Sequence, residues 1–318
     1  MIDGSATACW LGDDTRVNPN WGSLDLFGSG VDSWYNGLQF GVNKRMSNGL
    51  QFQSSYTFSK STDQNPGSSN VEQTPTQSSH SPDPTHPDVD KGPAIMDITH
   101  VYRFNAIYRL PRFTPSDGAA GRVMSGLFNG WWVSGILTLQ SGLPFTVALN
   151  SNRSRSGVNN GGGGNDRPNL VPGRTPENIV SGTSPGCGTG PTREEGGTAI
   201  APGTPLGTES LYFDPCAFTV PAAGFLGNVG RNSLRGPGYA GLDMTFAKDT
   251  RAGWLGESGM VQFRIEIFNV FNRANFESPE RIVLAGTAEG QNPLRDAGII
   301  TQTLGTMRQI QLALKVLF

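Results

Sequence analysis

The residues that could carry chemistry are few, and the cysteines come first among them. Three occur, Cys9, Cys187 and Cys216, and none has the spacing of a metal-ligand set. Cys187 and Cys216 lie in one long polar segment, so in an oxidising compartment they could close a disulfide. The alternative is that all three are free thiols. We therefore take Cys187 and Cys216 as the candidate disulfide.

The histidines and the glycine run offer no catalytic pattern. Residues 61–93 hold several potential metal ligands, namely His80, Asp83, His86, Asp88 and Asp90. They lack ligand spacing, and the Ser, Pro, Thr and Gln around them are typical of a mobile loop. Residues 161–164 are four glycines, without the Lys-Ser/Thr pair of a phosphate-binding loop. Hydrolase, zinc-protease, redox and nucleotide motifs are also absent. We expect no enzyme, no cofactor and no metal site.

The composition argues against a nucleic-acid partner but does not exclude a membrane protein. The chain of 318 residues holds 24 Lys and Arg against 26 Asp and Glu, so it lacks the basic excess of a nucleic-acid-binding protein. Only 16% of its residues are charged, and 43 are glycine. No run approaches the ~18 apolar residues of a membrane helix. The first ten residues lack the basic and apolar parts of a signal peptide.

Residues 305–318 predict a strand with two different surroundings. Every second residue from Ile310 to Phe318 is apolar, and the residues between them are mostly polar. Strict alternation of this kind indicates a strand. The closing strand of an outer-membrane barrel has this pattern, with lipid on one side and lumen on the other. Leu314, Val316 and Phe318 match the C-terminal assembly signal of such proteins. The alternative is the last strand of a soluble sandwich.

The same alternation recurs along the chain. Six further segments show it: 38–42, 50–59, 102–110, 133–140, 242–247 and 261–268. A short eighth strand is expected near residues 23–27. Ser47-Asn48-Gly49 predicts a tight hairpin. The predicted strands leave one face nearly free of charge, and we expect the charged residues of the other face to line a lumen: Arg103, Arg109, Asp243, Arg264, Glu266 and Lys315. The solvent face of a sandwich would also accept them.

The lengths of the connections favour the barrel. If the C-terminus is periplasmic, the outside connections are 61–97, 148–238 and 273–298. The inside connections are then 47–49, 111–128 and 249–259. Each outside connection is longer than the inside ones beside it, as in outer-membrane barrels. A soluble sandwich has no reason to alternate its loop lengths.

Several segments resemble barrel strands of TonB-dependent receptors of the large, acidobacterial Oar-like type. They begin with SWYNGLQ at residues 33–39, and the others are 43–50, 55–61, 130–135, 140–145, 227–238 and 263–272. The resemblance runs from about Asn18 to Phe318. It implies energised uptake of a large, scarce ligand through a barrel of about 22 strands with a lumen plug. It also implies three partners: outer-membrane lipid, the TonB system acting through the plug, and the barrel assembly machinery.

The expected fold class is therefore all-β, an antiparallel transmembrane β-barrel segment of about seven or eight strands with long extracellular loops. Residues 1–318 are expected to be the C-terminal part of a receptor in the cell outer membrane, beginning inside an extracellular loop. We expect the plug domain and the N-terminal strands of the receptor to be missing from residues 1–318. Two alternatives remain open: a secreted β-sandwich that binds a glycan or a surface partner, and a small unplugged porin.

Overall fold

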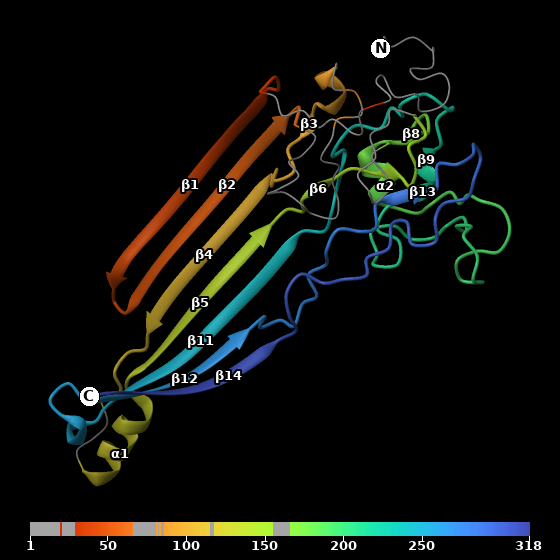
Figure 1. Cartoon of the computed structure of the whole chain (residues 1–318). Helices are drawn as coiled ribbons and strands as arrows, with labels where there is room; N and C mark the ends of the chain where they lie inside the picture. Colours follow the sequence, from red (N-terminus) through yellow and green to blue (C-terminus); the bar gives the residue numbers. More distant parts are fainter. Residues whose placement is uncertain are drawn as a thin grey trace.

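The computed structural model describes residues 20, 29–65, 81, 83, 86–114, 118–154 and 166–318. Seven long antiparallel strands lie side by side in one sheet, in the order β1-β2-β4-β5-β11-β12-β14 (Figure 1). Their bounds are β1 Ser33–Ser47, β2 Leu50–Asp63, β4 His100–Arg109, β5 Trp131–Gln140, β11 Tyr239–Arg251, β12 Met260–Phe268 and β14 Gln309–Leu317. The short β3, Gly92–Pro93, adds an eighth strand beside β2. The predicted all-β antiparallel fold is confirmed, although β1 begins five residues before the predicted segment.

The register of the sheet joins the apolar sides of all seven strands into one face. Residues directly opposite in neighbouring strands point to the same side of a sheet. One row across six strands consists of Leu50, Tyr108, Val133, Phe246, Ile265 and Leu312. We call this side the apolar face and the opposite side the polar face. A register slip of one residue in any strand would reverse its side chains, so the pattern specifies the pairing.

The sheet has two unpaired edges. Within the described residues, β1 pairs only with β2, and β14 pairs only with β12. The sheet is therefore open, and the first and last strands do not meet.

The tightest connection is the predicted hairpin between β1 and β2. Ser47 pairs with Leu50, and the two residues between them both have positive φ, 50° at Asn48 and 79° at Gly49. Asparagine and glycine tolerate this backbone region best, and two positive values in succession match the twist of a hairpin.

The other two connections at this end of the sheet contain helices that the sequence did not indicate. The helix α1, Ala119–Phe128, lies between β4 and β5, and the 3₁₀ helix η3, Gly253–Leu255, lies between β11 and β12 (Figure 1). No residue of α1 is buried. Among the described residues, no helix is long and apolar enough to cross a membrane.

At the opposite end of the sheet, three long connections fold together (Figure 1). We define the cap as the described parts of residues 64–99, 141–238 and 269–308. Its short elements, besides β3, are η1 Pro87–Asp90, β6 Pro144–Phe145, β7 Ala148–Leu149, β8 Asn169–Leu170, α2 Pro176–Val180, η2 Pro215–Ala217, β9 Phe218–Thr219, β10 Leu234–Arg235 and β13 Ile282–Leu284. The parallel pair β7 and β13 joins the second connection to the third.

The cap shows that one sequence-based interpretation was wrong in part. The Pro and Ser content of residues 61–93 predicts a mobile loop. The structure instead continues β2 to Asp63 and builds η1 and β3 from residues 87–93. Asp90 in this segment is buried. The reason is tertiary, because the second connection of the cap supplies the contacts that order this stretch.

Candidate functional site: the cap and the polar face

The cap has a hydrophobic core of its own. Phe145, Phe213 and Val283 are fully buried in it, and they come from two different connections. The rings of Phe145 and Phe213 lie 5.6 Å apart between centroids. Burial of such side chains stabilises a structure by about 1.5–3 kcal/mol each. The cap is therefore a folded body at the end of the sheet.

A disulfide and a buried carboxylate stabilise residues 174–216 within the second connection, 141–238. The structure joins Cys187 to Cys216, with Cα atoms 5.5 Å apart. Beside it, the fully buried Asp214 pairs with Arg174 and accepts hydrogen bonds from the Ser184 hydroxyl at 2.8 Å and the Cys216 amide at 3.1 Å. A buried carboxylate needs such partners, because its desolvation is otherwise costly. The disulfide and Asp214 thus stabilise the same small region.

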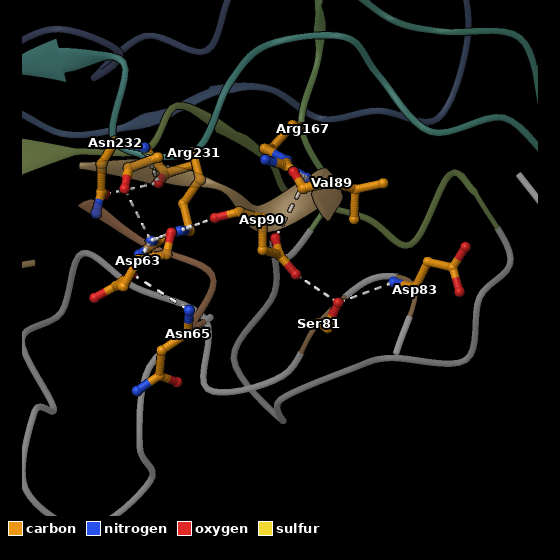
Figure 2. Close-up of polar contacts among 11 residues, drawn as sticks. Asp63, Asn65, Ser81, Asp83, Val89, Asp90, Arg167, Arg231 and Asn232 are labelled. Carbon is orange, nitrogen blue, oxygen red and sulfur yellow. Dashed lines mark hydrogen bonds and ion pairs between the residues drawn. The ribbon is translucent and has the colours of Figure 1, made fainter. Parts of the chain in front are cut away.

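Arg231 ties the second connection to the end of β2. Its guanidinium forms an ion pair with Asp63 and also donates to the Asp63 carbonyl at 2.9 Å (Figure 2). Its Nε donates to the carbonyl of Asp90 at 2.6 Å. Next to Arg231, the Asn232 side chain donates to the Pro93 carbonyl at 2.7 Å. Two neighbouring residues therefore hold the first connection against the second.

A second ionic contact lies deeper in the same network. Arg167 Nη2 lies 3.4 Å from Asp90 Oδ1 and donates to the Val89 carbonyl at 2.8 Å (Figure 2). The other oxygen of Asp90 accepts from the Ser81 hydroxyl at 2.5 Å. Burial raises the pKa of Asp90, and Arg167 and Ser81 oppose this effect. Burial also lowers the pKa of Arg167. Burial therefore makes each charge costly, and each group is stabilised in its charged form by the other.

Arg235 and Asp97 make a further link between the same two connections. They form an ion pair, and Arg235 Nη1 also donates to the carbonyls of Asp97 at 2.7 Å and Gly142 at 3.2 Å. Asp97 accepts the Ser61 amide of β2 at 2.6 Å. The cap is consequently fastened to the sheet at several points by charged hydrogen bonds, which are stronger than neutral ones.

The register places all six residues predicted to line a lumen on the polar face. They are Arg103, Arg109, Asp243, Arg264, Glu266 and Lys315. Arg264 and Glu266 pair at 2.9 Å. Within the described residues, no ion pair joins the other four to this pair, so the face is a set of spaced polar positions.

The polar face also carries contacts that the sequence did not indicate. Asp249 accepts the Trp132 indole N–H at 3.1 Å and the Gln262 amide at 2.7 Å. Gln262 in turn lies opposite Lys315 in the sheet. These side chains from β5, β11, β12 and β14 form a polar row near the end of the sheet that bears the short connections.

Charges on the apolar face lie toward the ends of its strands. Lys248 Nζ donates to the carbonyls of Gly126 and Asn129, each at 2.7 Å. Lys44 Nζ similarly donates to the carbonyls of Ser47 at 3.1 Å and Leu50 at 3.2 Å. Long side chains that carry their charge to an interface in this way leave the middle of the face apolar.

Some sequence-based candidates lie outside the described residues. These are Cys9, His80, the glycines 161–164 and the expected strand at 23–27. Within the described part of the chain, no group of three or more His, Cys, Asp or Glu side chains is arranged to hold a metal ion. His86 and Asp83 do contact each other, with 2.9 Å between Nδ1 and Oδ2.

Sequence reasoning missed the ion pairs of the cap. Arg231 and Arg235 were noticed only as part of a segment resembling a receptor family. No local pattern marks either arginine as an ion-pair partner, because its pairing with Asp63 or Asp97 depends on contacts between segments far apart in the chain.

Comparison with known proteins points to the same architecture. A family described as "Outer membrane beta barrel domain" matches residues 5–311. No curated protein matches the chain, and no solved structure does. The matched residues include nearly all of the sheet and the whole cap. The two faces of the sheet fit lipid on one side and a polar lumen on the other. The chain belongs to the outer membrane beta barrel domain family and is located in the outer membrane.

Proposed function

We propose that the chain is the C-terminal part of the barrel of a TonB-dependent receptor, which takes up a large, scarce ligand across the outer membrane. The observation that carries the proposal is the pairing of a two-faced sheet with a folded cap at one end. All three long connections lie at that end, and the short ones lie at the other. In outer-membrane barrels the long loops are extracellular.

The size and rigidity of the cap favour a receptor. Loops that only seal a small pore have little need of a hydrophobic core, a disulfide and several buried ion pairs. Pre-formed surfaces bind with a smaller loss of conformational entropy than mobile loops. A scarce ligand requires tight binding, so an ordered extracellular surface suits its capture.

The open sheet disfavours a small porin. Closure of a porin would require β1 and β14 to pair, and within the described residues they do not. Unpaired backbone groups cost several kcal/mol each in lipid, so further strands must cover both edges in a membrane. A wall of about 22 strands around a plug would supply them.

A secreted sandwich is the second alternative, and the apolar face argues against it. A sandwich covers that face with a second sheet. In the described residues, the other sheets are three two-stranded pairs in the cap. Leu312 and Leu314, on the apolar face of β14, are 69% and 68% exposed. These apolar side chains are suited to contact with lipid.

In this proposal the chain is not an enzyme, and its partners follow from the barrel. Lipid contacts the apolar face. The barrel assembly machinery recognises Leu314, Val316 and Phe318 on the closing strand. The TonB system supplies energy through a plug that lies outside residues 1–318. The polar face, including Arg264 and Glu266, lines the path of the ligand.

Two experiments test this proposal. The DNA upstream of the codon for Met1 should encode, in frame, a plug domain and about fifteen further strands. Residues 1–318 expressed alone behind a signal peptide should not form a heat-modifiable barrel, because both sheet edges stay unpaired. A folded, ion-conducting product from these residues would overturn the receptor proposal and support a small porin.

A further inference from the structure

A hollow opens on the sheet at the border between the apolar face and the cap. Its volume is about 270 Å³, and it is lined by residues that include Tyr56, His100, Tyr102, Leu139 and Arg273. The register places Tyr56, Tyr102 and Leu139 in one row of the apolar face. Gln140 and Tyr239, which also line the hollow, belong to the adjacent row of the polar face. The hollow therefore lies at the end of the sheet that bears the long loops, with its aromatic wall on the lipid side.

Small residues create this space. Ser141 and Gly238 line it beside Leu139, where β5 and β11 meet the cap. Tyr56 and Tyr102 are direct neighbours across β2 and β4 and bound the other side. The ring of His100 stacks near that of Tyr56, with 6.2 Å between the centroids. Aromatic side chains of this type are enriched where a membrane meets water.

The groups around the hollow can donate hydrogen bonds to an anion. The Tyr56 hydroxyl lies 2.8 Å from His100 Nδ1. When Tyr56 donates this bond, His100 carries its proton on Nε2, which is then a donor. The Tyr102 hydroxyl accepts from Ser54 at 3.3 Å and keeps its own proton to donate.

Arg273 supplies the positive charge. Its backbone is fixed by Asn269, which accepts its amide and donates to its carbonyl, both at 3.0 Å. Two residues further on, Asn275 bonds both the amide and the carbonyl of Ala240, at 2.8 and 3.0 Å. The guanidinium of Arg273 forms no hydrogen bond or ion pair with the described part of the chain. Among the described residues, no carboxylate lines the hollow.

We propose that this hollow binds the phosphate-bearing headgroup of a lipid in the outer leaflet. Arginine suits phosphate because its planar fork forms paired, charge-assisted hydrogen bonds. The next row of the same face, Phe104, Leu137 and Leu242, offers an apolar path for the acyl chains. A free phosphate would leave that path unused, so the occupant is an amphiphile. The proposal requires that the sheet is part of an outer-membrane barrel, and it holds whichever ligand the protein transports.

The test uses the protein purified from outer membranes in detergent, with lipid binding followed by native mass spectrometry. Three probes separate the contributions: a short-chain phosphatidic acid, the matching diacylglycerol without phosphate, and inorganic phosphate. Phosphatidic acid should bind well above the other two. Arg273→Gln should weaken its binding about tenfold, as expected when a hydrogen bond to a charged group is lost.

The controls keep this result interpretable. Arg295→Gln removes another exposed arginine of the cap that does not line the hollow, and it should leave binding unchanged. Arg273→Lys retains the charge and should bind better than Arg273→Gln. Each variant is first checked for heat-modifiable mobility. Equal binding of diacylglycerol and phosphatidic acid, equal binding of inorganic phosphate, or an unchanged Arg273→Gln variant would overturn the proposal.

Discussion

Arg231 and Asp63 are 168 positions apart in the chain, and they form an ion pair where β2 enters the cap (Figure 2). The same arginine donates to the carbonyl of Asp90. It therefore contacts the end of a spanning strand and the loop that follows it at the same time. Movement of the segment around Arg231 away from β2 would have to break these bonds, so they couple this part of the cap to the sheet.

The buried pair of Asp90 and Arg167 should be needed for the stability of the cap. Asp90→Ala leaves Arg167 buried without its carboxylate partner, and breaking such a pair costs about 3–5 kcal/mol. Protease cleavage of the cap in outer membranes should accelerate accordingly. Asp88→Ala is the matched control, because Asp88 is exposed and loses a hydrogen bond from Gln64 but no ion pair, so its effect should be much smaller. Equal cleavage rates in the two variants would contradict a structural role for Asp90.

Asp90 should also make the stability of the cap depend on pH. Burial raises its pKa above the ordinary 3.8, so the folded cap holds this proton more tightly than the unfolded chain does. The resulting stabilisation is complete below the unfolded pKa and is lost as the pH rises through the folded pKa. Asp90→Asn cannot ionise and should flatten this part of the curve. Thermal unfolding of the unchanged protein and of Asp90→Asn, measured from acid to neutral pH, tests this pH dependence. Parallel curves of unfolding temperature against pH would refute it.

The register predicts different tolerance at two adjacent positions of β12. Phe263 lies on the apolar face opposite Leu314, and Gln262 lies on the polar face beside Asp249. An arginine facing lipid near the midplane costs about 2–4 kcal/mol. Phe263→Arg should reduce the heat-modifiable form of the protein in the membrane fraction, whereas Gln262→Arg should assemble normally. Equal yields would mean that the faces are assigned incorrectly.

The disulfide should stabilise the second connection of the cap. Cys187 and Cys216 are 29 residues apart, and a closed loop of that length stabilises by about 3–4 kcal/mol in the chain-entropy account. The double change Cys187→Ser with Cys216→Ser should therefore lower the unfolding temperature of the cap. Peptide mapping without reductant should find the two cysteines linked in native membranes. Finding both as free thiols would exclude the bond.

Gly142 should not tolerate a side chain. A Cβ atom there would lie 1.8 Å from the carbonyl oxygen of Gly236, where the chain leaves β5 for the cap. Gly142→Ala would force the two segments apart, and such overpacking costs about 1–3 kcal/mol or more. At Gly253 a Cβ atom would meet nothing within 4 Å, so Gly253→Ala is the control. The melting temperatures of the two variants should differ clearly, and similar values would count against the close approach.

Local patterns were enough to predict the sheet. Alternation is a property of neighbouring residues, since successive side chains of a strand point to opposite faces. The apolar series ending at Val316 and the polar position of Arg264 could therefore be assigned before any partner strand was known. The turn at Asn48 and Gly49 was equally local, because its backbone angles suit those two residue types.

The cap was decided by tertiary structure. Its sequence is rich in Gly, Pro and Ser, and this composition predicts a mobile loop, which is wrong for residues 87–93. The helix α1 also escaped prediction. Asp63 and Arg231, or Asp97 and Arg235, carry no local mark of their pairing. Contacts between such distant residues form only when three long connections pack together, because the burial that this packing achieves offsets the entropy of ordering them.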